Sequence, residues 1–412
     1  MEGFGARQRG IVAVVVAISL LALLAMVGFA LDSGHLVLNK SRLQNTIDAS
    51  ALAAAKVLDQ TGSETQATAA ARSVFDLNAA NHPELGRVLD GNDIMVSYSN
   101  TLNPFVAGTT PANYVRVVAN DFTMWTSFTS LVGVSDIRTA ASAVAGPSAP
   151  IGSEEGNEAC DLAPMMICGD PAAGAAGNWG YTGDNVSLLK IASNAPSPVG
   201  PGNFQLIRLG GPGCDTVREN LAGGYESCLA SISNVDTQPG NCTGPVTQGL
   251  NTRFGDYRGG MSSADYPPDK VVTQPQPDLK VGGDGVTVTF QNNQPVNHIN
   301  DLSYSYDDYS QDLVTGPYDF PAGKPQRRVI AVPFVDCTTM VNGQGNVPVL
   351  GFGCFFLLQQ AVQKGNENFV FGEYIGECGA GGTPGPVPDP DPVGGPGIYK
   401  IVLHNDPLSA DS

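Results

Sequence analysis

Residues 11–31, IVAVVVAISLLALLAMVGFAL, form an apolar stretch that contains no charged residue. At ~1.5 Å per residue, a helix of this length spans ~30 Å, which matches the hydrocarbon core of a bilayer. A cleavable signal peptide has a shorter apolar core followed by a break, whereas this sequence continues through Asp32 into helix-favouring residues. The stretch therefore predicts a retained transmembrane helix.

The charges on the two sides of this stretch differ in sign. Residues 1–10 contain Glu2, Arg7 and Arg9, a net charge of +1, and the whole chain carries −18, which leaves −19 for the remainder. The positive-inside rule places residues 1–10 in the cytoplasm and the bulk on the far side of the membrane. So acidic a body is repelled by nucleic acid, and we expect no nucleic-acid partner.

The helix is expected to continue beyond the membrane, because no proline occurs before Pro83. Apolar residues recur at helical spacing at Leu43, Ile47, Ala51, Ala54 and Leu58. Such a stripe packs either against the chain's own domain or against a neighbouring subunit. A second helix is expected to start at the capping-box pair Ser63 and Gln66, with an apolar face made of Ala70, Val74 and Leu77.

Cysteine usage indicates an oxidising compartment. All eight cysteines lie beyond the apolar stretch, at Cys160, Cys168, Cys214, Cys228, Cys242, Cys337, Cys354 and Cys378. An even number on the translocated side predicts up to four disulfides, although the sequence cannot choose their pairing. Zinc is the alternative, but the spacing contains no C-x-x-C pair and no histidine lies near a cysteine cluster. We therefore expect no metal site.

The composition favours short strands and turns in most of the chain, since the whole sequence has 50 Gly and 30 Pro. The run GPSAPIGSEEGN, residues 146–157, predicts a domain boundary. Strands are expected at 186–191, 204–209, 286–290, 329–335, 347–358, 369–375 and 398–403. Residues 347–362 are too short and glycine-broken for a second membrane span, and residues 381–397 predict a loop.

Motifs that carry catalysis are missing from the sequence. There is no G-x-S-x-G, H-E-x-x-H or G-x-x-x-x-G-K-[ST] pattern, and the four histidines, His35, His82, His298 and His404, are scattered. We therefore assign no catalytic or cofactor-binding residue and expect a protein that is not an enzyme and needs no cofactor. Carboxylates of the kind that calcium prefers as ligands occur at Asp301, Asp307, Asp308, Asp312, Asp389 and Asp391. The other interpretation is that these residues lie in solvated loops.

Residues 7–59 resemble the TadG-like N-terminal region of the tight-adherence (Tad, Flp) pilus assembly proteins. The resemblance rests on the basic start, Gly10 before the apolar stretch, Asp32 after it, Leu43-Gln44, and the run from Asp48 to Ala54. Residues 114–146 are similar to the strand-rich end of a pseudopilin-like module, in which a long helix packs on a small antiparallel sheet. The resemblance implies a bacterial inner-membrane protein with its bulk in the periplasm.

Two features of that family are missing here. The Asp-x-Ser-x-Ser pattern that starts the metal site of a von Willebrand A domain does not occur, so an adhesive domain of that kind is not expected. Related pseudopilins carry a Glu five positions after the Gly of their prepilin peptidase site, and Gly3, Gly5 and Gly10 have no such partner. We expect the N-terminus to stay uncut.

These observations predict an α+β protein with one transmembrane helix that extends into a pseudopilin-like helix-plus-sheet module, followed by a β-rich, disulfide-containing domain. The expected parts are a cytoplasmic N-terminus, the membrane helix, the module, a linker and the periplasmic domain, at 1–10, 11–31, 32–146, 147–157 and 158–412. The predicted function is that of a membrane-anchored structural component of pilus assembly. The alternative is a minor pilin or a surface adhesin or ligand-binding module, with calcium dependence as one option.

The partners implied are other pilus assembly proteins or pseudopilins, the inner membrane, and further copies of the chain or other subunits in an oligomer. The residues predicted to form a partner interface lie on the membrane-proximal helix: Leu43, Gln44, Asp48 and Leu52. Asp48 has no obvious cation on its own helix and is expected to meet one on a partner. The other interpretation of these four residues is local packing and solvation.

Overall fold

The structure is a computed structural model of the chain. It describes residues 8–126, 128–133, 136–151, 158–191, 198, 202–230, 233–338, 343–365, 367–379, 382–383 and 397–409. Two compact units divide the chain at Pro147. Unit 1 contains the N-terminal part to Gly146 and the residues from Leu403 onward, and unit 2 contains Pro147–Val402 together with Leu58–Ser63. The chain thus leaves unit 1, forms unit 2, and returns.

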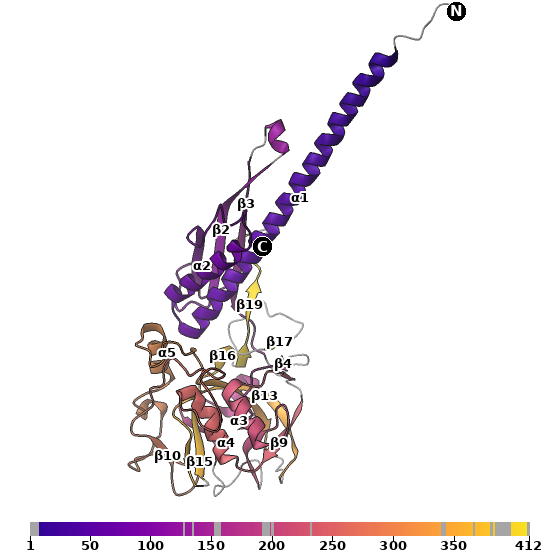
Figure 1. The fold of residues 1–412 in the computed structure, drawn as a ribbon. Helices are drawn as coiled ribbons and strands as arrows, with labels where there is room; N and C mark the ends of the chain where they lie inside the picture. The colour runs from indigo at the N-terminus through magenta and orange to yellow at the C-terminus, as the bar shows by residue number, and fades with distance from the viewer. Residues whose placement is uncertain are drawn as a thin grey trace, which may run out of the picture. The chain divides into compact units, whose positions relative to one another are not determined.

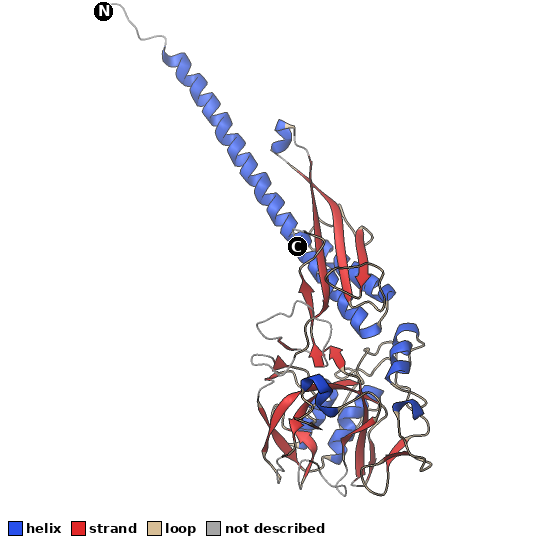
Figure 2. Ribbon diagram, turned by 180° about the vertical axis from the view of Figure 1, so that it is seen from behind, coloured by secondary structure: helices blue, strands red, loops and turns tan. Residues whose placement is uncertain are grey.

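Unit 1 begins with a very long helix, α1, at Gln8–Thr61, and continues with α2 at Glu64–Ala80. A four-stranded sheet follows in the order β1-β2-β3-β19. Its strands are β1 Ile94–Ser99, β2 Tyr114–Trp125, β3 Asp136–Pro147 and β19 Ile401–His404. Figure 1 and Figure 2 show α2 and the second half of α1 lying beside this sheet, as expected for a helix-plus-sheet module.

The core of unit 1 confirms the helical stripe predicted on α1. Leu43, Ile47, Ala51 and Ala54 are fully buried. Two polar residues on the same stretch are also buried, and their hydroxyls bond the helix itself. Thr46 donates to the carbonyl of Arg42 at 2.9 Å, and Ser50 donates to that of Thr46 at 2.7 Å. Because these bonds stay within the helix, the polar residues add no unsatisfied group to the core.

The face predicted for α2 is wrong. The buried residues are Ala67, Ala71, Phe75 and Ala79, whereas Leu77 is 67% exposed. Phe75 has the largest apolar side chain of this helix and is fully buried, and the alanines one turn away on the same face allow close approach. The face predicted from Val74 and Leu77 is therefore rotated by about one residue from the face that Phe75 buries.

Unit 2 is built around an eight-stranded sheet with β14-β15-β13-β12-β5 as its main path. In addition, β6 pairs with β15, and β9 pairs with both β13 and β7. The strands of this sheet are β5 Ile167–Gly169, β6 Val186–Lys190, β7 Asn203–Ile207, β9 Asn234–Pro239, β12 Val329–Asp336, β13 Asn346–Leu357, β14 Val362–Lys364 and β15 Glu367–Tyr374. The strands β12 and β13 pair antiparallel along most of their length.

Smaller pairs complete unit 2: β10 with β11, β16 with β18, and β4 between β17 and β8. Their bounds are β4 Glu158–Ala159, β8 Leu229–Ala230, β10 Leu279–Val281, β11 Val288–Phe290, β16 Glu377–Gly379, β17 Gly382–Thr383 and β18 Gly397–Tyr399. The single strand expected at 398–403 is divided between β18 and β19, which lie in different sheets. The predicted loop at 381–397 lies mostly outside the described residues.

Three helices of unit 2 were not predicted from the sequence: α3 Cys214–Gly223, α4 Thr243–Asn251 and α5 Tyr306–Thr315. On β12, Ile330, Val332 and Phe334 belong to the same core cluster as the buried residues of α3 and α4, while Ala331 belongs to another cluster. This alternation follows from the two-residue period of a strand and gives the sheet apolar contacts on both faces. The remaining short helices are η1 Thr129–Val132, η2 Ala175–Gly180, η3 Thr252–Phe254 and η4 Ile299–Asp301.

Four disulfides stabilise unit 2, and every cysteine takes part. The pairs are Cys160–Cys228, Cys168–Cys337, Cys214–Cys242 and Cys354–Cys378. The second of these joins the parallel neighbours β5 and β12 near their ends, and the fourth joins β13 to β16. The α+β class and the disulfide-containing, β-rich second part are therefore as predicted.

Candidate functional site

The first half of α1 is an apolar surface. From Val12 to Leu31 its large apolar side chains are 56–68% exposed. Within the described residues, α1 is the one helix that is long and apolar enough to cross a membrane. Contiguous apolar surface of this extent is covered by lipid or by protein in the cell. This surface is the first element of the candidate site.

Asp32 marks the C-terminal end of the apolar surface and accepts three hydrogen bonds from the segment between β2 and β3. The backbone N–H groups of Phe128 and Thr129 lie 2.9 and 2.7 Å from its Oδ2 atom. The hydroxyl of Thr129 lies 3.0 Å from the same oxygen. A carboxylate that accepts several such bonds is well satisfied as an anion. The contact therefore fastens the tip of the β2–β3 hairpin to α1.

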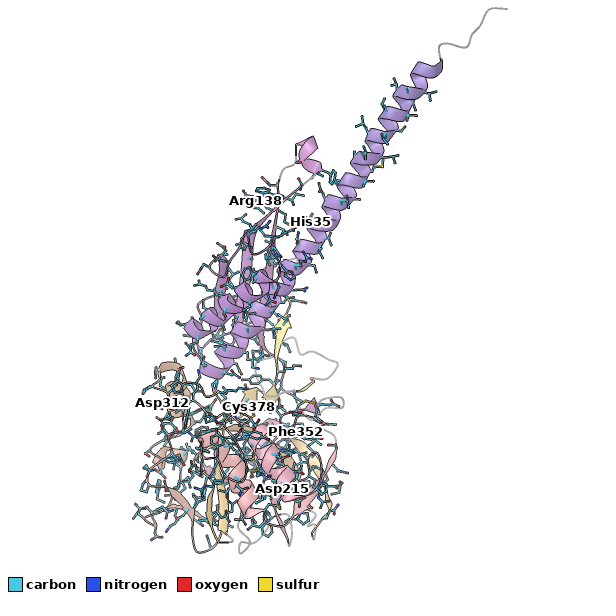
Figure 3. The ribbon with its side chains drawn as sticks, viewed as in Figure 1. His35, Arg138, Asp215, Asp312, Phe352 and Cys378 are labelled. Atoms are coloured by element: carbon cyan, nitrogen blue, oxygen red, sulfur yellow. A yellow bond between two sulfur atoms is a disulfide. The ribbon has the colours of Figure 1, made fainter. Side chains whose placement is uncertain are left out.

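A second polar cluster fastens the segment after α2 to the same helix. The side chain of Asn39 donates to Glu84 at 2.6 Å, and the ring of His35 lies 2.9 Å from the other carboxylate oxygen. Although partial burial raises the pKa of Glu84, the hydrogen bonds from Asn39 and His35 bring it below its usual value. Glu84 is therefore held as an anion beside the helix. His35 is labelled on α1 in Figure 3.

The four residues predicted as a partner interface have different environments. Leu43 is fully buried within unit 1, so its side chain has no surface to offer a partner. Gln44 donates to Asp48 at 2.7 Å and to the backbone carbonyl of Ser142 on β3 at 2.8 Å. Partial burial raises the pKa of Asp48, and the bond from Gln44 opposes this shift. Leu52 is half-buried.

An ion pair that was not predicted from the sequence connects β2 to the C-terminal segment. Arg116 Nε lies 2.9 and 2.8 Å from the two carboxylate oxygens of Asp406, whose side chain is fully buried. The ring of Tyr114 also packs edge-on against His404, with centroids 5.6 Å apart. The residues involved are 290 positions apart in sequence, and no local pattern in the sequence indicates this pairing.

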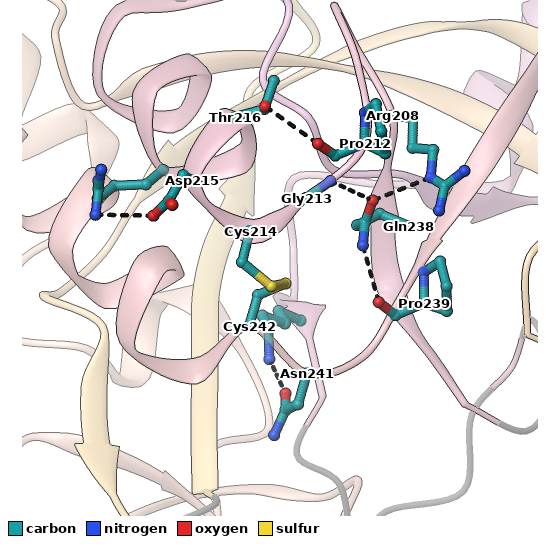
Figure 4. Close-up of a disulfide and its surroundings, with 12 residues drawn as sticks. Arg208, Pro212, Gly213, Cys214, Asp215, Thr216, Gln238, Pro239, Asn241 and Cys242 are labelled. Atoms are coloured by element: carbon teal, nitrogen blue, oxygen red, sulfur yellow. Dashed lines mark hydrogen bonds and ion pairs between the residues drawn. A yellow bond between two sulfur atoms is a disulfide. The ribbon is translucent and has the colours of Figure 1, made fainter.

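Hydrogen bonds before the start of α3 position one of the disulfides (Figure 4). Cys214 opens α3 and pairs with Cys242 directly before α4. The Oε1 atom of Gln238 accepts from the backbone N–H of Gly213 at 3.1 Å and from Arg208 at 3.0 Å. These bonds hold the segment before α3 against the end of β9. The disulfide then fixes the starts of both helices to each other.

Unit 2 also buries charged groups. Arg328 is fully buried, with its guanidinium 4.4 Å from the ring centre of Phe356 and hydrogen-bonded to backbone carbonyls that include those of Thr273 and Leu357. Asp269, also fully buried, accepts from the hydroxyl of Tyr309 at 2.7 Å. Burial raises the pKa of Asp269, and the hydrogen bond from Tyr309 opposes this shift. These hydrogen bonds and ring contacts give both buried charges partners within unit 2.

Three of the acidic residues considered for calcium, Asp301, Asp308 and Asp312, accept hydrogen bonds from nearby groups. Asp301 accepts from the backbone N–H of His298 at the start of η4, and Asp308 accepts from that of Ser305 before α5. Asp312 accepts from the hydroxyl of Tyr304 at 2.9 Å. Among the described residues, no group of three His, Cys, Asp or Glu side chains could hold a metal ion. Asp389 and Asp391 lie outside the described residues.

The comparisons with known proteins agree with the geometry of α1. No curated protein and no solved structure shows significant similarity to this chain. One family model matches, and it covers residues 10–57, which are the apolar stretch and the part of α1 that packs in unit 1. Residues 10–57 of this chain thus match the model of the TadE/G-like family of Flp pilus-assembly (Tad) proteins, and this segment is similar to that family.

Proposed function

We propose that this protein is a structural, non-enzymatic component of the Tad pilus assembly machinery that acts through protein–protein contacts. The observation that carries the proposal is the family match at residues 10–57, on a helix whose first half is an exposed apolar surface. The helix anchors the chain in the inner membrane, and its second half is the core helix of unit 1. Unit 2 is a disulfide-bonded domain that lies on the same side of the membrane as unit 1.

The proposed orientation has the N-terminus in the cytoplasm and both folded units in the periplasm. It is supported by the two arginines before the apolar stretch and by the four disulfides after it, since disulfides form and persist in oxidising compartments. Alkaline phosphatase fused after residue 60 is expected to be active in cells. An inactive fusion, with the same reporter active when placed before residue 10, would reverse the orientation.

The assembly role is tested by following the protein in the bacterium that makes it. Washed inner membranes and sheared, purified pili are probed for the chain, and its apparent mass is compared with that of the uncut chain. Full-length protein that stays in the membranes after alkaline carbonate extraction supports an anchored assembly component. Shortened protein that travels with the fibre would instead identify a minor pilin or an adhesin.

The predicted interface on α1 is tested with Leu52, which is half-buried and lies close to Gln44 and Asp48 on the helix. We expect Leu52→Ala to lower the recovery of other pilus assembly proteins that copurify with the tagged chain. Lys56→Ala, at an exposed position one turn further along, is the matched control and is expected to leave the recovery unchanged. Equal recovery with all three proteins would contradict an interface at this position.

A further inference from the structure

The β2–β3 hairpin reaches the apolar half of α1, not only its polar end. Among the described residues from Val12 to Leu31, Gly28 is buried and the others are exposed. A Cβ atom placed on Gly28 would lie 2.7 Å from the Cβ atom of Phe128, so Phe128 packs directly on the bare backbone of α1 at this point. Gly28 precedes Asp32 by about one helical turn, or ~6 Å along the axis. Phe128 therefore lies level with the last turn of the apolar surface.

The composition of the hairpin tip suits the edge of a bilayer. Residues 122–135 contain no charged side chain. Trp125 is 81% exposed and Phe128 is 47% exposed. Tryptophan is enriched where the hydrocarbon meets the headgroups, because its ring is apolar and its N–H group can bond to water or headgroups.

Charged residues begin where the hairpin leaves its tip. Asp136 pairs with Trp125 across the two strands. Further down, Arg138 and Asp121 form an exposed ion pair at 3.6 Å, and Figure 3 labels Arg138 on the hairpin. An uncharged tip with charges directly behind it follows the same polarity as α1, in which Asp32 ends the apolar surface.

We propose that the tip of the β2–β3 hairpin is a second membrane contact, which inserts Phe128 and Trp125 into the outer leaflet of the bilayer that α1 crosses. The proposal rests on the proposed membrane anchoring of α1. The bilayer is the expected occupant because the tip adjoins, through Gly28, the surface that lipid already covers. Asp32 lies at this boundary, where its three donors from the hairpin replace water and reduce the cost of placing a carboxylate there.

The contact gives α1 a fixed orientation. A single apolar helix can tilt and rotate in a bilayer, and interfacial aromatic residues are among the groups that set these angles. A hairpin that is bonded to Asp32 and inserted beside the helix restrains both motions. Unit 1 is then held at one height above the membrane surface.

The experiment uses the full chain reconstituted in phosphatidylcholine and phosphatidylglycerol liposomes. The protein has two tryptophans, Trp125 and Trp179, so the difference in emission between the wild type and Trp125→Phe reports Trp125 alone. We expect this emission to be quenched by lipids brominated near the headgroup and protected from iodide in the water. Trp179 belongs to unit 2, and the remaining emission of Trp125→Phe serves as the internal control.

Gly28→Leu provides the directed test, because a side chain at this position must displace Phe128. Ala30→Leu is the matched control, since Ala30 is exposed on the same apolar stretch and faces away from Gly28. Each protein is measured beside its own Trp125→Phe version. We expect Gly28→Leu to abolish the quenching of Trp125 by bromolipid and to restore quenching by iodide, while Ala30→Leu behaves as wild type.

The outcomes separate this inference from the proposed function. If wild-type Trp125 is quenched by iodide and not by bromolipid while the protein still floats with the liposomes, the hairpin contact is refuted and the anchor stands. Protection from both quenchers would place the tip against protein and would equally refute it. If the protein does not float with the liposomes, the membrane anchor itself is refuted, and the hairpin contact with it.

Discussion

Lys190 is a buried lysine whose amino group contacts neutral oxygen atoms. Its Nζ atom donates to Asn241 Oδ1 and, at 3.3 and 3.4 Å, to the backbone carbonyls of Ile191 and Asn368. Burial lowers the pKa of Lys190 from 10.5 to about 7. Above this pH the folded chain holds Lys190 neutral while the unfolded chain still binds the proton. Because the unfolded state then binds more protons, unfolding is expected to become harder as the pH rises from about 7 toward 10.5.

The prediction is a free energy of unfolding for unit 2 that increases by up to about 2 kcal/mol between about pH 7.5 and pH 9, below the range in which unfolded tyrosines ionise. Urea unfolding of the Trp125→Phe protein, followed by Trp179 emission, measures it. Lys190→Met is expected to remove most of this dependence. An equally steep increase in Lys190→Met would assign the effect to another group.

Arg328 illustrates a buried charge that the fold satisfies completely through backbone carbonyls and aromatic rings. Arg328→Ala removes these bonds and leaves several buried carbonyls without a donor. We expect a loss of about 3–5 kcal/mol in the stability of unit 2. Arg258→Ala, at a side chain that is 72% exposed, is the control and is expected to cost less than about 0.5 kcal/mol. If denaturant unfolding showed similar losses of stability for both variants, the buried position of Arg328 would contribute nothing to the stability of unit 2.

At the scale of elements, two disulfides of similar loop length provide a comparison. Cys214 and Cys242 are 28 residues apart and join two helix starts, and of this pair only Cys242 is buried, whereas Cys354 and Cys378 are 24 residues apart and are both buried. Chain entropy predicts a loss of about 2–4 kcal/mol for either pair when it is replaced by serines. Cys354→Ser with Cys378→Ser also places two hydroxyls in an apolar cluster and should cost more. Thermal unfolding of the two double variants compares these losses of stability. A larger loss for the Cys214 and Cys242 variant would show that burial does not determine the cost.

At the scale of the whole molecule, unit 1 is completed by residues from both sides of unit 2 in the chain. The ion pair between Arg116 and the fully buried Asp406 connects them. Arg116→Met leaves the carboxylate without this cation, and we expect a cost of about 3–5 kcal/mol. Faster amide hydrogen exchange in β19 would report the loss. Arg138→Met, in an ion pair whose two side chains are more than 70% exposed, should leave that exchange unchanged, because surface pairs contribute little. Unchanged exchange in both variants would mean that β19 is held by its strand pairing alone.

The sequence by itself determined the features that depend on neighbouring residues. The apolar stretch at 11–31 and the buried stripe through Leu43 and Ile47 follow from composition and from the 3.6-residue period of a helix. The even cysteine count beyond the apolar stretch indicated disulfides. The four candidate interface residues lie on α1, but which of them are buried was not evident from the sequence.

Only the tertiary structure decided the contacts between residues far apart in the chain. The cysteine pairing, the return of β19 to the sheet of unit 1, and the bonds from Phe128 and Thr129 to Asp32 belong to this group. The helices α3, α4 and α5 are short, and helices of about ten residues are marginal alone, so packing on the sheet decides whether they form. Long-range contacts repay the entropy of closing large loops only when the whole fold is present, and a local sequence pattern carries no record of them.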